Sequence, residues 1–288
     1  MTHRQNYGMG SMGMPHNQLY GEYQPSLIQY QQRPIVSNEI AFDRFWPIYS
    51  KALYIISRTF DASDAQYVEA LKLFFISLLN LVPNSSVRQN ISDFLLMKPH
   101  VVKDLLNGVS NTFIAYPWLE NMLKTDSTTQ AGTFNQMCYK NQDGQALFLW
   151  MYLLDSYLII CQQKMNATSL QIKNLNTIRT MYQANKITKA DWGNSIWFIL
   201  HTASLYAPQP MQQSFENYKN LMSALRFLLP CPKCRTHLNE NLKYIDFDNC
   251  PKNNQELFKC SWKLHNIVNV SDNKPQIGLQ KAFAMYTF

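Results

Sequence analysis

Two predicted helices meet at Leu229-Pro230-Cys231-Pro232-Lys233-Cys234-Arg235. Apolar residues recur at helical spacing before it. Because proline has no N–H group to donate inside a helix, one helix is expected to end at about 229. Proline fits the first turn of a helix, so the next helix is expected to begin at about 231. The pattern therefore places two cysteines in the opening turn of a helix.

The pair Cys231 and Cys234 predicts redox chemistry. The backbone amides and dipole of a helix N-terminus stabilise a thiolate on the first cysteine, and Lys233 and Arg235 add positive charge. Such a thiolate can attack a disulfide or, in reverse, be the sulfur through which a dithiol is oxidised. By itself, a CxxC motif is only moderately specific.

Two other kinds of site also contain a CxxC motif. A structural zinc site needs two further ligands, and only His237 stands near, so we predict no metal. A thioredoxin-type oxidoreductase places the motif after a strand, whereas the flanking sequence here has helical spacing throughout. A redox pair in a helical protein is the favoured interpretation.

The surrounding sequence predicts an all-α protein. Only 9 of the 288 residues are glycine, 46% are hydrophobic, and the apolar runs show little strict alternation. From residue 187 onward, these runs predict a compact bundle of five helices, at about 191–206, 212–229, 231–244, 253–270 and 276–286.

Two further regions precede this bundle. Residues 1–37 are rich in Gln, Tyr, Met, Gly and Pro and have no helical period, so we expect a disordered tail. Residues 38–186 have helical spacing, with breaks expected at Pro47, Pro83, Pro99 and Pro117. The predicted regions are therefore 1–37, 38–186 and 187–288.

The two helical regions share short similarities. Residues 78–88 can be laid on residues 225–235 around a common Leu-x-Pro and an arginine, with Asn84 and Val87 where the two cysteines stand. Further matches place Trp46 and Ser50 opposite Trp197 and His201, and Asp155 and Ser156 opposite His265 and Asn266. They need different offsets, and chance similarity between amphipathic helices is the alternative. If they are real, residues 38–186 form a degenerate, non-catalytic copy that pairs with the second region as a pseudo-dimer within one chain.

Charge and apolar runs bear on two classes of partner. The formal net charge is +7, but the 26 Lys and Arg residues are scattered, which favours a solvated surface over a nucleic-acid site. The longest apolar run, from Ala146 to Cys161, contains Asp155 and is shorter than the roughly 20 residues of a spanning helix. We therefore expect this run in a protein core and no membrane span.

Two clusters of polar and aromatic residues accompany the cysteines. Trp197, His201 and Ser204 share one face of a helix, and Val268 and Asn269 share a face with His265 in another. Either histidine alone would be read as an ordinary, partly buried histidine satisfied by hydrogen bonds. Three clusters in this order favour a site.

The C-terminal third resembles the Erv/ALR family of flavin-linked sulfhydryl oxidases. The family pattern is a Gly before WxxxHxxA, a Pro-CxxC, and then HNxVNxxxxKP. Residues that match it, between about 190 and 288, are Gly193, Trp197, His201, Cys231, Cys234, His265, Asn266, Val268, Asn269, Lys274 and Pro275. A preceding helical half without the motif resembles the arrangement in baculovirus-type viral sulfhydryl oxidases.

The resemblance implies a four-helix bundle that holds FAD non-covalently, with a short fifth helix. Cys234 would be the cysteine next to the flavin, and Cys231 the one that meets substrate. The enzyme would oxidise dithiols in protein substrates, with dioxygen as electron acceptor and hydrogen peroxide as product. Residues implied to bind the cofactor are Gly193, Trp197, His201, Tyr206, Cys234, His265, Asn266, Val268, Asn269 and Lys274.

The sequence departs from the family pattern in three places. Asn194 stands where a basic residue often follows the glycine, the usual Trp-x-Cys is inverted as Cys260-Ser261-Trp262, and a second, shuttle CxxC is missing. A disulfide between Cys250 and Cys260 is therefore left open, and Cys138 and Cys161 are expected to be buried thiols. The alternative function is a non-enzymatic helical scaffold.

Location and assembly are less constrained by the sequence. No apolar stretch of the secretory kind stands at the N-terminus, so the expected location is the host cytoplasm or nucleus, or the virion if the chain is viral. A pseudo-dimer within one chain leaves larger assembly, such as a homodimer, open.

Overall fold

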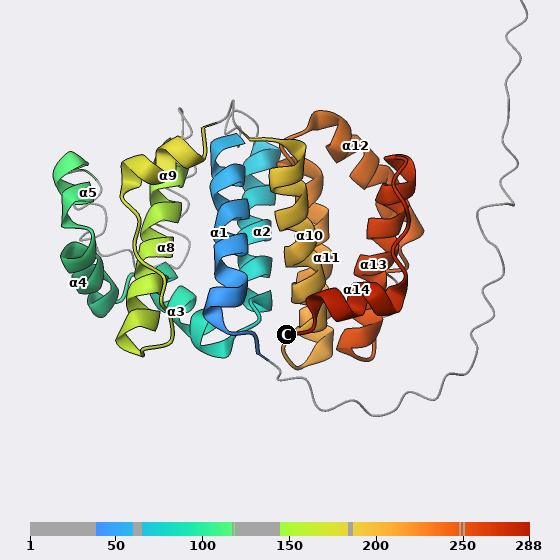
Figure 1. Cartoon of the computed structure of the whole chain (residues 1–288), viewed down its shortest axis with the longest axis horizontal. Coiled ribbons are helices and arrows are strands. Elements are labelled where there is room, and N and C mark those ends of the chain that lie inside the picture. Colours follow the sequence, from blue (N-terminus) through green and yellow to red (C-terminus); the bar gives the residue numbers. More distant parts are fainter. Residues whose placement is uncertain are drawn as a thin grey trace, which may run out of the picture. The chain divides into compact units, whose positions relative to one another are not determined.

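The computed structural model describes residues 39–59, 65–116, 118, 145–183, 187–247, 249 and 251–288. All the secondary-structure elements in these ranges are helices (Figure 1), so the all-α prediction is confirmed for this part of the chain. The described residues pack as one compact unit. The tail expected at residues 1–37 lies outside the described residues.

The C-terminal helices lie close to their expected positions. They are α10 (Lys189–Leu205), α11 (Met211–Leu228), α12 (Pro232–Asn241), α13 (Asn254–Ser271) and α14 (Leu279–Tyr286). Helix α12 ends earlier than expected because the chain tightens into a 3-10 turn, Leu242–Tyr244. Asn253 caps α13 by accepting a hydrogen bond from the Glu256 amide at 3.0 Å.

The N-terminal helices vary widely in length, from 6 residues in α5 to 20 in α8. The described ones are α1 (Phe42–Thr59), α2 (Ala65–Leu81), α3 (Ser85–Leu95), α4 (Pro99–Gly108), α5 (Ser110–Ala115), α8 (Gln145–Lys164) and α9 (Leu175–Met181). Pro83 separates α2 from α3 and Pro99 opens α4, as expected. Pro117 lies outside the described residues.

The expected break at Pro47 is wrong, because this proline lies inside α1. Proline removes the hydrogen bond that residue 47 would donate to the carbonyl of residue 43, four positions earlier. Both Asp43 and Pro47 are exposed, so water can reach the unpaired carbonyl. The apolar face of α1 continues unbroken past Pro47 through Tyr49 and Leu53, and its burial outweighs the lost bond.

Helices from the two predicted regions pack directly against each other. Helix α2 runs along α11, and α1 lies against α10 (Figure 1). Phe74 on α2 and Leu221 on α11 are fully buried, and burial of one such side chain contributes about 1.5–3 kcal/mol. The hydroxyls of Tyr49 and Thr202 lie 2.9 Å apart across the α1–α10 contact. The chain therefore has a core that both regions share.

Helix α8 carries the long apolar run. By length and composition α8 would suffice to cross a membrane, but 78% of its most apolar window is buried inside the protein. Its Asp155 accepts hydrogen bonds from the Trp46 indole at 2.7 Å and from the Tyr54 hydroxyl at 3.0 Å, both on α1. This helix is thus packed as a core element.

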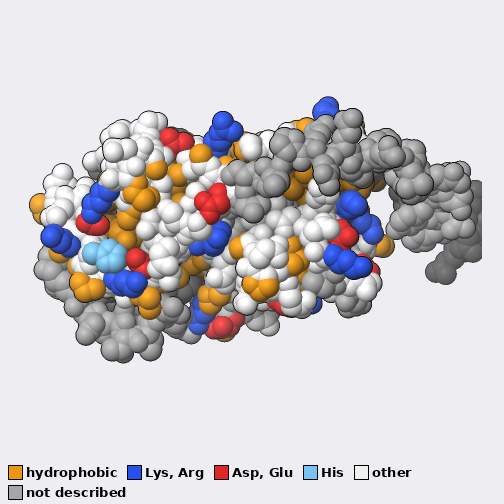
Figure 2. Space-filling view, turned by 90° about the horizontal axis from the view of Figure 1, so that it is seen from below, with side chains coloured by type: hydrophobic (Ala, Val, Ile, Leu, Met, Phe, Trp, Pro, Cys, Tyr) orange, Lys and Arg blue, Asp and Glu red, His pale blue; other side chains and the backbone are white. Residues whose placement is uncertain are grey.

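Charged side chains are distributed over the surface. Figure 2 shows lysine and arginine side chains interspersed with acidic and apolar ones across the described part of one face. Several cations are paired with acids, as in Lys164–Asp104 at 2.5 Å and Lys72–Glu69 at 2.7 Å. On this face, the charge is mixed rather than gathered into one basic patch.

Two helix N-termini are capped in the same way. Asn84 caps α3 by accepting a hydrogen bond from the Val87 amide at 3.0 Å. Cys231 caps α12 through its sulfur, which accepts from the Cys234 amide at 3.2 Å. The positions correspond to those that the sequence comparison aligned. The relation between the two regions, and their boundary at 186, stay predictions.

We predict that Asp155 makes stability depend on pH. Burial raises the pKa of Asp155 above its ordinary value, although its two hydrogen bonds oppose the shift. A raised folded-state pKa means that stability is present in acid and is lost as pH rises through that pKa, by at most about 1.4 kcal/mol per pH unit. Asp155→Asn keeps an oxygen acceptor but cannot titrate. The free energy of unfolding of the variant, measured in urea, should therefore increase relative to that of the wild type as pH rises. A difference between the two proteins that does not change with pH would contradict the prediction.

Candidate functional site

A disulfide joins Cys231 and Cys234 at the start of α12. Pro232 occupies the first position of the helix, where a missing N–H leaves no helical bond unmade. Both cysteines are half-buried and pack against the hydrophobic core. The redox pair predicted from the sequence is therefore bonded, partly accessible and located at a helix N-terminus.

Aromatic and imidazole rings line the contact between α10 and α13. Trp197 and His265 stack with ring centroids 4.0 Å apart and planes 6° apart. The ring of His201, one turn further along α10, lies 5.9 Å from Trp197 and 5.1 Å from His265. Trp197 and His265 remain half-exposed, whereas His201 is fully buried. The structure thus brings together three residues that the sequence placed on two faces.

A hydrogen-bonded chain links these histidines to a serine. The Ser261 hydroxyl lies 2.6 Å from His201 Nδ1, and His201 Nε2 lies 2.9 Å from His265 Nδ1. One assignment that satisfies both contacts has Ser261 donating to His201 and His201 donating to His265. The outer nitrogen of His265 is then a free N–H group.

Both imidazoles are neutral at pH 7. Burial, followed by the charge of His265, lowers the pKa of His201 to about 3. Burial, followed by the charge of Lys274, lowers the pKa of His265 to about 4. The site therefore presents uncharged flat rings rather than imidazolium groups, and Lys274 lies near enough to act on His265.

Asn266 holds the segment that follows α13. Its side-chain amide donates to the Ile277 carbonyl at 2.9 Å, and its side-chain oxygen accepts from the Ile277 amide at 2.9 Å. The Trp262 indole donates to the same carbonyl at 2.6 Å. Asn269 is buried, and its carbonyl accepts from the Lys274 amide at 2.7 Å. These bonds fix the backbone that carries Lys274.

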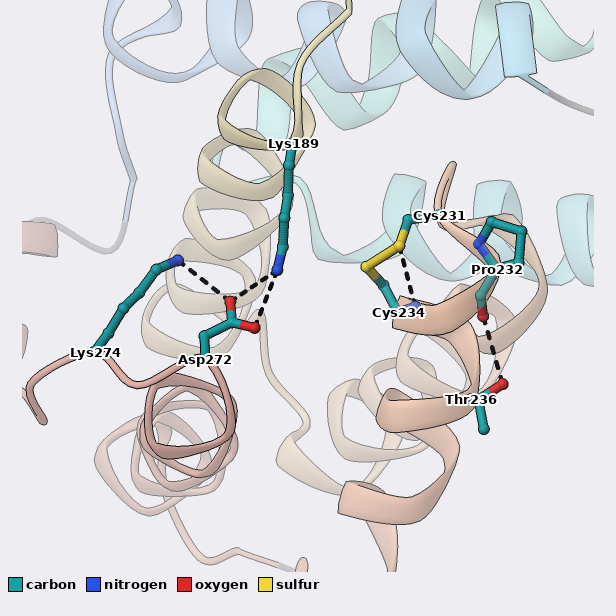
Figure 3. Close-up of a disulfide and its surroundings, with 7 residues drawn as sticks. All are labelled: Lys189, Cys231, Pro232, Cys234, Thr236, Asp272 and Lys274. Atoms are coloured by element: carbon teal, nitrogen blue, oxygen red, sulfur yellow. Dashed lines mark hydrogen bonds and ion pairs between the residues drawn. A yellow bond between two sulfur atoms is a disulfide. The ribbon is translucent and has the colours of Figure 1, made fainter.

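Two lysines meet one carboxylate near the disulfide end of the bundle. Lys189 Nζ lies 2.9 Å and Lys274 Nζ lies 3.3 Å from Asp272 Oδ2. Figure 3 shows both ammonium groups turned toward Asp272, with the disulfide across from them at the start of α12. Asp272 has a lowered pKa because it accepts from Lys189. Two cations on one anion leave a net positive charge at this end.

Tyr206 lies at the opposite end of α10. The helix has 17 residues, so its ends are roughly 25 Å apart. The Tyr206 hydroxyl accepts a hydrogen bond from the Phe288 amide at 2.8 Å. Tyr286, on α14, places its ring 4.4 Å from that of His201. The structure therefore does not bring Tyr206 to the disulfide, but joins it to the C-terminal segment.

The residues present fit a flavin nucleotide. A Cβ added at Gly193 would meet nothing within 4 Å, so there is space beside α10 one turn before Trp197. The exposed part of the Trp197–His265 stack suits a planar ring system, and the charge of Lys189 and Lys274 suits a diphosphate. Val268, like these rings, is half-buried on α13.

The remaining cysteines show no redox pairing in the described residues. Cys260 and Cys161 are both free, half-buried thiols, and burial raises the pKa of each. The expectation that Cys161 is buried therefore holds only in part. Cys138 and Cys250 lie outside the described residues.

Several residues of the site have no role in the sequence pattern. Ser261 stands four positions before His265, so helical spacing could have placed it on the same face. Lys189 and Asp272 are 83 positions apart, and the sequence contains no signal that pairs them. Tyr286 reaches His201 only because α14 folds back on α10.

Comparison with known proteins confirms the resemblance inferred from the sequence. Residues 194–287 match the model of the Erv1 / Alr family. The chain is 31% identical over 96 residues to an Invertebrate iridescent virus 3 protein whose name describes it as an FAD-linked sulfhydryl oxidase. That alignment covers 33% of this chain and 65% of the relative. It is 34% identical over 112 residues to the FAD-linked sulfhydryl oxidase ERV1 of Arabidopsis thaliana, with 38% and 54% covered.

A third relative is the FAD-linked sulfhydryl oxidase ERV1 of Oryza sativa subsp. japonica, 30% identical over 105 residues, or 36% of this chain and 53% of the relative. The chain thus spans less than two thirds of the length of these curated relatives. No solved structure matches the chain. The family match, residues 194–287, contains the disulfide, the stacked rings and Lys274, whereas Lys189 lies just before it.

We predict that Ser261 stabilises the site. Ser261→Ala removes the partner of the buried His201 Nδ1 and should lower the free energy of unfolding by about 1–3 kcal/mol. Ser271, on the same helix, is exposed and donates only to the Ile267 carbonyl. Ser271→Ala is the matched control and should change stability by less than about 0.5 kcal/mol. Equal effects in urea denaturation would show that the serine–histidine contact is not stabilising.

Proposed function

We propose that the chain is an FAD-linked sulfhydryl oxidase that forms disulfides in protein substrates. The observation that carries this proposal is the half-buried Cys231–Cys234 disulfide at the start of α12, in the region that matches the Erv1 / Alr model. The stacked neutral rings support it, and so do two lysines that share Asp272, Lys189 at the start of α10 and Lys274 just after α13.

The cysteines would perform the exchange with substrate. A substrate thiolate attacks Cys231, and Cys234, in the first turn of α12, leaves as a thiolate that the positive end of the helix dipole favours. The second substrate thiol then displaces Cys231. The substrate loses two electrons and two protons and gains a disulfide, while Cys231 and Cys234 become thiols. When bound, the flavin supplies a two-electron acceptor that can pass those electrons to dioxygen, giving hydrogen peroxide.

The rings between α10 and α13 would bind and orient the cofactor. Trp197 and His265 offer a flat apolar surface, and the buried Ser261–His201 pair fixes the plane of His265. Neutral imidazoles avoid placing a second positive charge beside Lys274. Asn266 and Asn269 would act through the backbone they hold, and Gly193 through the space that its missing side chain leaves.

The two lysines would bind the cofactor diphosphate. Asn194 is not basic, and Lys189 supplies a positive charge at the start of the same helix. Lys189 and Lys274 are 57% and 60% exposed, so both side chains can reach a ligand without repacking. Asp272 would hold them in place until the phosphates compete for them.

We also propose that residues 38–186 are a degenerate copy of the catalytic region. The matching caps at Asn84 and Cys231 support this, and so does the pairing of α2 with α11 and of α1 with α10. Trp46 donates a hydrogen bond to Asp155, and Trp197 stacks on His265, so each tryptophan contacts the residue that the sequence comparison aligns with the other's partner. The compartment expected from the sequence stays a prediction.

The proposal predicts a yellow protein. The purified chain should absorb in the flavin bands and consume oxygen when a small dithiol is added. Cys231→Ser should abolish turnover and keep the flavin, because serine cannot form the exchange disulfide and Cys231 is not part of the ring stack. Cys260→Ser, at another half-buried thiol, is the matched control and should keep most activity. A folded preparation that takes up no FAD would refute the function.

The two lysines predict how FAD affinity responds to salt. Lys189→Gln and Lys274→Gln should each weaken FAD binding by about two- to fivefold, as expected for exposed charge pairs. The double variant should lose most of the salt dependence that the wild type shows. Lys164→Gln, which removes the ion pair between α8 and Asp104 on α4, is the control and should bind FAD normally. Titration of flavin-stripped protein measures the affinity, and unchanged affinity in the double variant would exclude the lysines.

A further inference from the structure

Arg235 ties the first turn of α12 to the neighbouring helix. Its guanidinium Nη1 donates to the Phe227 carbonyl at 3.1 Å, near the C-terminal end of α11. Its backbone amide donates to the Cys231 carbonyl at 3.1 Å, within the turn that carries the disulfide. A residue next to Cys234 is thus fixed at both its backbone and its side chain.

The other contact of this guanidinium comes from the first half of the chain. Arg235 Cζ lies 5.3 Å from the ring centroid of Tyr67, at the start of α2. The Tyr67 ring also lies 6.2 Å from the ring of Phe227. Guanidinium groups are attracted to aromatic faces, and the planar group keeps its hydrogen bonds while stacked. Tyr67 therefore holds Arg235 from outside the region that matches the Erv1 / Alr model.

A fixed cation on the residue after Cys234, in the helical turn that carries the disulfide, affects the two redox states unequally. The disulfide is neutral, whereas the reduced pair contains a thiolate fraction that a nearby positive charge stabilises. A guanidinium free to swing into water would be screened and would stabilise the thiolate less.

We propose that Tyr67 and Arg235 are positioning residues through which the N-terminal half raises the reduction potential of the Cys231–Cys234 pair. The first half then has a role in the reaction without any reacting group of its own. This inference rests on the proposed function only in requiring that the pair be redox-active. The redox change is the two-electron, two-proton reduction of the disulfide to two thiols by two molecules of glutathione, which become glutathione disulfide.

The test compares the equilibrium of this exchange in four variants of the full chain. Each protein is equilibrated in glutathione buffers, its thiols are alkylated, and the peptide that contains both cysteines is quantified by mass spectrometry. Arg235→Gln should lower the equilibrium constant for reduction about tenfold, which is about 30 mV for a two-electron couple. Tyr67→Leu should lower it about threefold. Tyr67→Phe, which keeps the ring, should leave it unchanged.

Arg88→Gln is the matched control for Arg235→Gln. Arg88 is the aligned arginine in α3, and its Nη1 donates to the Val82 carbonyl at 2.5 Å. Losing it should lower thermal stability without changing the equilibrium constant. If Arg235→Gln fails to fold, Tyr67→Leu decides the question.

The outcomes separate this inference from the proposed function. A wild-type pair that does not exchange with glutathione would refute both. Wild-type exchange with the same constant in Tyr67→Leu would overturn the inference alone. The inference is also overturned if the variants lower the melting temperature but leave the equilibrium constant unchanged. The contact between Tyr67 and Arg235 would then be merely structural.

Discussion

Helix α2 buries Leu71, Phe74 and Leu78, and α11 buries Leu221 and Leu225; the two helices pack along each other. This shared apolar layer positions the turn that carries the disulfide and the start of α2. Helix α11 ends at the turn that leads into the disulfide, and α2 begins beside the same turn with Tyr67. Because the layer belongs to both regions, separating one region from the other would expose large apolar side chains to water. The first region is therefore part of the environment of the redox pair.

The polar contacts on either side of this layer differ in one respect. In the first region, the Trp46 indole and the Tyr54 hydroxyl both donate to Asp155, so the indole N–H of Trp46 already has a hydrogen-bond acceptor. In the second region, Trp197 stacks on His265 and stays half-exposed beside the space at Gly193. The carboxylate of Asp155 accepts hydrogen bonds from both neighbouring side chains, whereas the neutral imidazole of His265 contacts Trp197 through its ring face. The first arrangement closes a core, and the second leaves a surface for a planar ligand.

Positive charge at the disulfide end comes from three sources, two of them in α12 and the third in the two lysines on Asp272. The N-terminus of α12 is the positive end of a helix dipole. Lys189 and Lys274 share Asp272 and leave one positive charge in excess. Arg235 is fixed next to Cys234. All three favour anions, either a thiolate or a phosphate, over neutral groups. Their shared sign suits the thiol exchange that we propose for this pair of cysteines.

The helical class, the bounds of α10 to α14 within a few residues, and the pairing of Cys231 with Cys234 could all be predicted from the sequence. These follow from local constraints, namely apolar spacing, proline geometry and the reach of a CxxC turn. The sequence misjudged Pro47, because burial along one face of α1 outweighs one lost hydrogen bond. Tertiary structure alone decided the contacts of Lys189 with Asp272, Ser261 with His201, and Tyr67 with Arg235. Each joins residues at least 60 positions apart, and such contacts depend on how helices pack rather than on any local pattern.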